Sequence, residues 1–410
     1  MTLRSVAVVA LFWAVVLGAT RILVAPSETC GDAAAPHLRR SADSAAAWMT
    51  RAAQPDGSYL YGYDRDSDRV SLDYNEVRHA GVTMALYQAA GRFDDAGALA
   101  AADAAVAWME GRLVRGEGWA ALPTPDGRRA KLGSVGLAVV ALAERRLATG
   151  EVRYDALMRE LGAFIARMQR PDGSFHAIWL IDAGSVDPTA TSRFYPGEAL
   201  WALALLHEAF PGAGWDRRAR AAARYLIEQR DEDEMIPFPP LPDHWLAYGL
   251  AEMAEWDLPA DEAFARALAG RFGLLIRTEA QEGGLRPVLG KPTRISGGSL
   301  GVLVEGLAAL WRLSVADPRL SHLTPAIEER LACGAAILAR RQAGADEAAG
   351  SARPSLVEGA WFHHGETRMD DQQHAFSALL YAGDALQGRA QRGPDDLLAA
   401  AVAADSGAGR

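Results

Sequence analysis

The feature that most constrains this chain is a pair of helical segments that recurs six times between residues 38 and 386. In each pair an amphipathic segment comes first, and a loop rich in glycine, proline and aromatic residues follows it. The second segment is apolar nearly all round. A helix that is apolar around its circumference is buried, whereas an amphipathic helix covers a core from outside. Hairpins of this kind cannot bury their apolar faces alone, so each one must stack on its neighbours.

The expected outer and inner helices alternate along the chain. The outer helices are expected at about residues 38–54, 95–113, 153–169, 217–229, 261–278 and 325–342. The inner helices are expected at about residues 73–88, 132–146, 196–208, 244–256, 298–313 and 370–386. Proline and glycine mark the end of the first outer helix in the sequence PDGSY at 55–59, which returns as PDGSF at 171–175 after the third.

The composition favours helices over strands. Half of the 410 residues are hydrophobic, and the apolar residues are mostly alanine and leucine, which are good helix formers. Strand-like alternation is scarce. A chain of this length forms one large domain or two ordinary ones. Six hairpins with apolar inner helices can close into a ring, which leaves no hairpin exposed at an end. The sequence therefore predicts an all-α fold.

This pattern resembles the (α/α)6 toroid of six-hairpin glycosidases, uronate lyases and sugar epimerases. The PDGS-aromatic loop, with a glutamine just before it, also resembles loops in terpenoid-cyclase toroids. The resemblance covers about residues 38–390, and it is specific for architecture rather than activity, because one fold hosts many functions. We expect the toroid domain at residues 31–390 and a loose tail at residues 391–410, which are rich in alanine, glycine and aspartate.

The first 30 residues are typical of a signal peptide or a signal anchor with a linker. Arg4 precedes an apolar run at residues 6–19, as in the charged and hydrophobic regions of a secretory signal. The run is short for a membrane span, Arg21 interrupts it, and no clear A-x-A cleavage site follows. A cleaved signal and an uncleaved anchor therefore both stay open. We expect an exported protein, periplasmic or extracellular, with or without a membrane anchor.

The cysteines, the net charge and the motifs limit which partners and cofactors are expected. Cys30 and Cys333 form no CxxC pair, so a thiolate zinc site is not expected. A disulfide between them and two free thiols are equal alternatives. The net charge of −10 disfavours a nucleic-acid partner, which would need a cationic face. We expect no cofactor and no metal, because no phosphate-binding or dinucleotide motif is present and the histidines at 363, 364 and 374 lack a fixed helical spacing.

The N-termini of all inner helices should meet at one end of such a ring, which we call the mouth. Positive helix dipoles and unpaired N–H groups gather there, which suits an anionic or hydroxyl-rich ligand. Lys131 precedes the second inner helix, and four other mouths offer a guanidinium group, from Arg78, Arg193, Arg294 and Arg368. Guanidinium binds a carboxylate or phosphate through two parallel bonds. One hypothesis is that these arginines bind a shared anionic ligand. The other is that each forms an ion pair with a nearby acid such as Glu76, Asp187 or Asp370.

Acid–base residues lie in the same segments, and the candidates for catalysis are Asp73, His79, Tyr195, Glu198, Asp371 and His374, with Asp243, His244 and Asp370 in the wider set. A glycoside hydrolase needs two carboxylates beside the bond that it breaks, which Asp73 or Glu198 would supply together with Asp371. The alternative for Glu198 and His374 is a buried, hydrogen-bonded position between inner helices.

A uronate lyase or C5-epimerase must instead remove the proton next to a carboxylate. Asn75 and Arg78 are suited to neutralising that carboxylate, and His79 or Tyr195 to acting as the base. Aromatic rings stack on sugar faces and also stabilise carbocations. Trp245 and Trp361 are therefore candidates for substrate binding, and packing between loops is the alternative.

The leading hypothesis is an exported carbohydrate-active enzyme, either a hydrolase, a lyase or an epimerase, that acts on a glycan in the mouth. A glycan that contains uronic acid, or another small anionic ligand, is the more specific form of this hypothesis. One alternative is a terpenoid-cyclase-like toroid, for which residues 369–371 hold only a fragment of the usual acidic motif. Another is a non-catalytic toroid that binds an envelope glycan or a partner protein.

Overall fold

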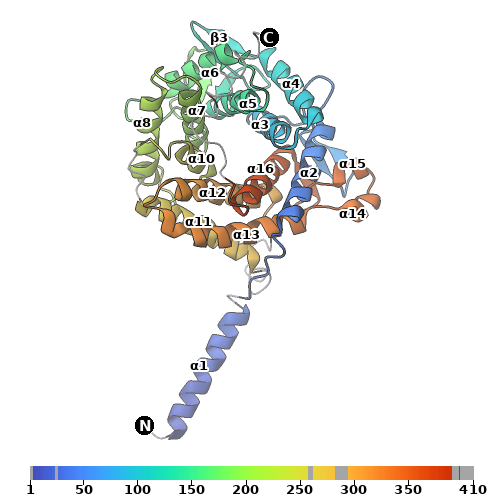
Figure 1. The fold of residues 1–410 in the computed structure, drawn as a ribbon, viewed down its shortest axis with the longest axis vertical. Helices are drawn as coiled ribbons and strands as arrows, with labels where there is room; N and C mark the ends of the chain where they lie inside the picture. The colour runs from blue at the N-terminus through green and yellow to red at the C-terminus, as the bar shows by residue number, and fades with distance from the viewer. Residues whose placement is uncertain (1–2, 24–25, 257–261, 282–293, 390–396, 398–410) are drawn as a thin grey trace.

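The computed structural model describes residues 3–23, 26–256, 262–281, 294–389 and 397. Twelve helices of the described residues form two concentric rings (Figure 1). The inner ring contains α3 (Glu76–Phe93), α5 (Leu132–Thr149), α7 (Tyr195–Ala209), α10 (His244–Glu252), α12 (Gly297–Ala316) and α16 (Met369–Ala385). The outer ring contains α2 (Ala35–Ala52), α4 (Ala96–Glu110), α6 (Asp155–Met168), α8 (Trp215–Glu228), α11 (Glu262–Ala280) and α13 (Thr324–Arg341).

The ring is closed. Each inner helix contacts the next one along the chain, and α16 returns to contact α3 and α2. This arrangement confirms the predicted (α/α)6 toroid. The difference between the two helix types is also as expected, because every residue of α5 from Leu132 to Arg146 is buried, whereas α8 buries only one stripe. The fourth inner helix is shorter than expected and ends at Glu252.

Glycines let the inner helices approach closely. A Cβ atom added at Gly301 of α12 would lie 2.6 Å from the carbonyl carbon of His374 on α16, and one added at Gly136 of α5 would lie 3.1 Å from that of Glu198 on α7. Such distances leave no room for a side chain. Glycine at these positions therefore sets the spacing of the helices that carry the candidate residues.

The two PDGS segments form the same turn and join neighbouring outer helices. Gly57 and Gly173 both have positive φ angles, of 86° and 96°. A Cβ atom at Gly57 would lie 2.3 Å from a carbonyl oxygen of α4, and one at Gly173 would lie 2.2 Å from a carbonyl oxygen of α8. Only glycine combines this backbone conformation with so close a contact. The repeated sequence is therefore a device for stacking hairpins.

Short helices and strands fill the loops. The helices are α9 (Arg230–Asp233), α14 (Ala345–Ala349), α15 (Pro354–Val357) and the 3-10 helix η1 (Ser321–Leu323). The strands are β1 (Gly62–Asp64), β2 (Arg69–Val70), β3 (Val114–Gly116), β4 (Trp119–Ala121), β5 (Arg129–Lys131), β6 (Ile178–Leu180), β7 (Ser185–Val186) and β8 (Glu366–Arg368). All pairings are antiparallel, in the orders β2-β1-β8, β3-β4 and β5-β6-β7. The pair β1–β8 joins the first hairpin to the last, with Gly62 opposite Arg368.

The N-terminal segment forms helix α1 (Leu3–Leu23), which projects away from the ring in Figure 1. By length and composition two of the described helices are able to cross a membrane, over Arg4–Arg21 and Gly297–Ala316. The second is α12, which is mostly buried in the ring. Cys30 and Cys333 form a disulfide, which settles the alternative that the sequence left open. The expected tail at residues 391–410 lies outside the described residues apart from Leu397, and the domain boundaries stay predictions.

Candidate active site

The N-termini of the inner helices meet at one end of the ring and bring ionisable side chains together there. Lys131, the residue before α5, forms an ion pair with Glu76, the first residue of α3, at 3.0 Å between Nζ and Oε1. Tyr195 begins α7, and the pKa of its hydroxyl is raised by burial and then by the charges of Glu198 and Glu76. These contacts link the mouths of α3, α5 and α7.

The mouths of α10, α12 and α16 meet at a pair of histidines. His244 begins α10 and His374 lies on the second turn of α16, and their ring centroids are 5.0 Å apart at an interplanar angle of 76°. The Nδ1 atom of His374 donates to Oε2 of Glu305 on α12 at 2.7 Å. The hydroxyl of Tyr248 donates to the other oxygen of Glu305 at 3.0 Å.

The two histidines have opposite electrostatic environments. Burial, the largest single effect, would lower the pKa of His374, but the Glu305 carboxylate together with the charges of Asp370 and Asp371 raises it. The pKa of His244 is lowered far below its usual value by burial and then by the nearby His374. Neither ring nitrogen of His244 has a hydrogen-bond partner among the described residues. The site therefore holds a neutral imidazole with a free lone pair beside an imidazole that favours its charged form.

The local sequence explains the position of His244. Asp243 caps α10 because its Oδ1 accepts from the backbone N–H groups of Trp245 at 3.1 Å and Leu246 at 3.2 Å. Its Oδ2 atom forms a fully buried ion pair with Arg230 Nη1 at 2.6 Å. The cap and the ion pair together hold the first turn of α10, so the His244 ring is fixed in place.

Glu198 is a second unusual group at the mouth. It lies on the first turn of α7, and burial, followed by the charge of Asp243, raises its pKa to about 8. Its Oε2 atom is buried without a hydrogen-bond partner among the described residues. A Cβ atom at Gly133 would lie 2.0 Å from that oxygen, so α5 leaves space for the carboxyl group. A carboxyl group of this kind carries a proton at neutral pH and is able to donate it.

Arg78 and Arg368 form ion pairs with acids at the start of α16, as the ion-pair alternative predicted. The Nε atom of Arg78 lies 3.0 Å from Oδ2 of Asp370, and that of Arg368 lies 3.6 Å from both Asp370 Oδ1 and Asp371 Oδ2. Arg193 is exposed in the loop before α7. These positions give the shared anionic ligand less support than the sequence did, because Asp370 already compensates two of the cations.

Arg294 and Trp361 lie together, away from the histidine pair. Both line a cleft of about 550 Å³ between the start of α12 and the end of α13, with Arg341 on its wall. Trp361 is 2% exposed, and its Nε1 atom donates to the Leu338 carbonyl oxygen at 2.9 Å. Trp361 therefore packs between hairpins, as the alternative for the loop aromatics expected. The expectation that it stacks on a substrate has no support from this position.

The side chain of His79 also points away from the mouth. It is fully buried between α3 and α4, where its ring stacks on Trp108 with centroids 4.3 Å apart. Its Nε2 atom donates to the Ala105 carbonyl oxygen at 3.1 Å, so Nδ1 accepts from the Tyr74 hydroxyl at 2.6 Å. Burial lowers its pKa to about 4. This neutral histidine fastens an inner helix to an outer one, because its side of α3 faces away from the ring axis.

The remaining candidates divide between structural and peripheral positions. Asn75 caps α3 and accepts from two backbone N–H groups. Asp371 is buried, and it accepts from the N–H groups of Gly298 at 3.0 Å and Arg368 at 3.2 Å, so it ties the starts of α12 and α16 together. Asp73 is exposed and accepts from a neighbouring serine. Trp245 is buried with its ring centroid 5.6 Å from that of His374, so it forms part of the wall of the histidine pair.

Two members of the histidine cluster were missed from the sequence, Glu305 and Tyr248. The signal for Glu305 was present, because it is the only charged residue in the apolar stretch from Gly297 to Trp311. A carboxylate in the middle of a buried helix needs a partner, so such an acid indicates a polar contact inside the ring. The sequence did not tell which helix would supply that partner.

No family model and no curated protein sequence matches this chain. Solved structures do match it. A cellobiose 2-epimerase from Spirochaeta thermophila DSM 6192 is 16% identical with a TM-score of 0.60, over 86% of this chain and 98% of that one. A D-mannose isomerase is 13% identical with a TM-score of 0.59, over 84% and 96%. An unsaturated glucuronyl hydrolase specific for heparin is 13% identical with a TM-score of 0.56, over 87% and 100%. At these identities the likeness shows the fold.

Proposed function

We propose that this protein is a carbohydrate-active enzyme that moves a proton on a sugar, as an epimerase or an isomerase does. The observation that carries the proposal is the pair of histidines at the mouth, held 5.0 Å apart and pushed toward opposite protonation states. Two titratable groups whose pKa values are driven apart are the usual sign of an acid and a base.

The roles follow from the surroundings of each ring. Neutral His244 takes the proton from a carbon atom next to a carbonyl group, because its nitrogens have no partner among the described residues that would compete for it. The electrons of the C–H bond form an enediol as His374 gives its own proton to the carbonyl oxygen. His244 is then charged and His374 neutral, so the proton count balances. Return of the His244 proton to the neighbouring carbon completes an isomerisation, and its return to the other face of the first carbon, after the enediol has turned over, completes an epimerisation. In both cases an enediol hydroxyl gives its proton back to His374 as the product carbonyl forms, so both histidines regain their starting states.

Glu305 positions and tunes His374 in this scheme. Its carboxylate accepts from His374 and from Tyr248, so it holds the ring in one orientation and stabilises its charged form. Trp245, beside His374, offers an apolar face that suits a sugar ring. The names of the cellobiose 2-epimerase and the D-mannose isomerase describe this type of chemistry, and their fold is similar to that of this chain.

A neutral sugar is the first substrate class to test. Arg78 and Arg368 are paired with Asp370, so a uronate would have to displace that carboxylate before it could use them. A uronic-acid-containing glycan is the second class, with the exposed Arg193 as a further cation near the start of α7. The disulfide supports export, because disulfides persist in oxidising compartments.

A glycoside hydrolase is the second candidate function, and Glu198 is the observation that favours it. Its pKa of about 8, and an Oε2 atom with no hydrogen-bond partner in the described part of the chain, suit a general acid that protonates a leaving group. Asp370 or Glu76 would be the second carboxylate. Because Glu198 and the histidine pair lie on different inner helices, variants separate the two functions.

The test uses the full-length protein in heavy water with neutral hexoses and disaccharides and, separately, with uronate-containing oligosaccharides, followed by proton NMR. We expect deuterium to appear at the carbon next to the carbonyl group. This labelling should be lost in His244→Asn and in His374→Asn and kept in Glu198→Gln. New reducing ends that depend on Glu198 would instead establish the hydrolase. Sugars that stay unchanged and unlabelled would overturn both functions and favour a binding toroid.

A further inference from the structure

Helix α1 is exposed along nearly its whole length in the part of the chain that the structure describes, and its side chains are mostly apolar. Val8, Leu11, Phe12 and Leu17 are each 60–67% exposed. The charged residues of α1 are Arg4 and Arg21, one near each end. Its 21 residues give a length of about 31 Å, which matches the hydrocarbon core of a bilayer. An isolated apolar helix of this length is stable in lipid and unstable in water.

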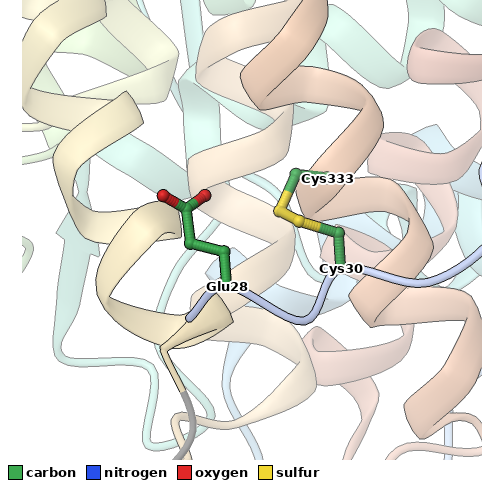
Figure 2. Close-up of side chains that lie close together, drawn as sticks. All are labelled: Glu28, Cys30 and Cys333. Atoms are coloured by element: carbon green, nitrogen blue, oxygen red, sulfur yellow. A yellow bond between two sulfur atoms is a disulfide. The ribbon is translucent and has the colours of Figure 1, made fainter. Parts of the chain in front are cut away.

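The segment that follows α1 is fastened along the outside of the ring. We call residues 27–34 the strap. Cys30 is joined to Cys333 in the middle of α13 (Figure 2). The carboxylate of Glu28, next to the disulfide in Figure 2, forms ion pairs with Arg277 of α11 at 2.9 Å and with Arg330 of α13 at 2.5 Å. One covalent bond and two ion pairs therefore fix the start of the strap to two outer helices.

Backbone contacts continue this attachment. Both the N–H and the hydroxyl of Thr29 donate to the Ala280 carbonyl oxygen at the end of α11, at 2.9 and 3.2 Å. Arg340 Nη2 donates to the Thr29 carbonyl oxygen at 3.2 Å. A Cβ atom at Gly31 would lie 3.6 Å from the Ala336 carbonyl oxygen, so the strap runs in van der Waals contact with α13. The strap is thus part of the folded domain and not a free linker.

The short covalent connection limits how far α1 can lie from the edge of the ring that is formed by α11 and α13. Five residue steps separate Leu23 from Glu28, and a fully extended chain covers about 18 Å in five steps. Helix α11 also carries exposed Arg266 and Leu274, the latter 55% exposed, in addition to Arg277, which is paired with Glu28. A basic and apolar surface suits the anionic headgroup region of a membrane.

We propose that α1 spans a lipid bilayer and that the strap holds the edge formed by α11 and α13 against the bilayer surface, so the ring stands on this edge. Figure 1 shows α1 leaving the ring in the plane of the ring and next to α13. The mouth then opens sideways, along the membrane, toward glycans that lie at its surface. This proposal is independent of the reaction at the mouth.

The test measures the distance of two opposite edges from lipid in the full-length protein. Leu274→Cys on α11 and Val152→Cys in the loop between α5 and α6, both at exposed positions, are labelled with a fluorophore in separate preparations. The described cysteines are both in the disulfide, so the new thiol is the one that reacts. Each preparation is inserted into vesicles of phosphatidylcholine and phosphatidylglycerol that contain spin-labelled lipids. Stronger quenching at position 274 than at position 152 is expected.

Two matched variants test the strap itself. A flexible spacer of about twenty Gly and Ser residues after Leu23 leaves the disulfide intact and adds about 25 Å of reach, so the excess quenching at 274 should be lost. A triple variant without these attachments, Cys30→Ser with Cys333→Ser and Glu28→Gln, should also reduce the excess quenching at position 274. If the triple variant does not fold, the spacer variant still decides the question. Equal quenching at both positions, or an excess that survives the spacer, would overturn the proposal. So would a full-length gene product from which the cell cleaves α1 and which then fractionates as soluble.

Discussion

The Nδ1 atom of His374 lies 2.7 Å from Oε2 of Glu305, so a histidine of the last inner helix donates a hydrogen bond to a carboxylate of the fifth inside the ring. Gly301 makes this contact possible, because any side chain there would separate α12 from α16 at His374. A ring nitrogen of His244 lies within 4.8 Å of both a His374 nitrogen and a Glu305 oxygen, and neither nitrogen of the His244 ring has a hydrogen-bond partner among the described residues. The first prediction depends on this arrangement.

Replacing Glu305 by Gln should lower the pKa of His374 by about one unit or more, because an opposite charge in contact shifts a pKa by about 1–3 units. His374 donates only while it is protonated, so turnover is lost as pH rises through its pKa. The alkaline limb of the pH–rate profile should therefore move to lower pH in Glu305→Gln. NMR titration of labelled histidines checks the pKa directly. Glu262→Gln, at an exposed position of α11, is the control, and an unmoved limb would contradict the role of Glu305.

His79 distinguishes the position seen in the structure from the role first expected for it. Replacing His79 by Ala removes its stack on Trp108 and two hydrogen bonds, and should lower the free energy of unfolding by about 2–4 kcal/mol. Turnover per folded molecule should stay near that of the parent chain. Urea unfolding and initial rates at low temperature measure the two effects. If turnover falls by two orders of magnitude while the free energy of unfolding stays unchanged, His79 takes part in the reaction.

Glu198 should make stability depend on pH in the neutral range. Its pKa rises from 4.5 in the unfolded chain to about 8 in the folded one, so the folded state binds an extra proton between these values. Stability contributed by this group is complete below pH 4.5 and falls as pH rises to 8, by at most about 5 kcal/mol at 1.36 kcal/mol per unit.

Thermal unfolding from pH 5 to 9 tests this prediction about Glu198. The Glu198→Gln variant should lose this part of the slope, because glutamine does not titrate. Curves that run parallel for the two proteins would show that Glu198 is already ionised at pH 5 in the folded state. Asp73→Asn, at an exposed position, serves as the matched control.

Breaking the disulfide should destabilise the domain. Cys30 and Cys333 are 303 residues apart, and removing a native disulfide costs about 2–5 kcal/mol, mainly because the unfolded chain becomes less restricted. Urea unfolding with and without a reductant should differ by this amount in the parent chain and not at all in Cys30→Ser with Cys333→Ser. If the reductant does not change the parent chain, the disulfide has no part in stability.

The hairpins were predictable from the sequence because they depend on local information. The apolar run from Leu132 to Arg146 marks a buried helix wherever it packs, and Asp243 before His244 marks the start of one. The site was less predictable, since residues at the start of one helix point in different directions. Adjacent positions on a helix lie about 100° apart, so Arg78 reaches Asp370 at the mouth, whereas His79 turns toward α4.

The number and order of the hairpins, and the end of the ring where polar groups collect, were readable from the amino-acid sequence, because period and capping are properties of neighbouring residues. The tertiary structure alone decided that His374 meets Glu305 and His244, that Asp370 pairs with Arg78 and Arg368, and that Cys30 reaches Cys333. These contacts join residues from different hairpins, so they depend on the rotation and spacing of whole helices. The pair of Arg78 and Asp370 exists only because the ring closes, since it joins the first inner helix to the last.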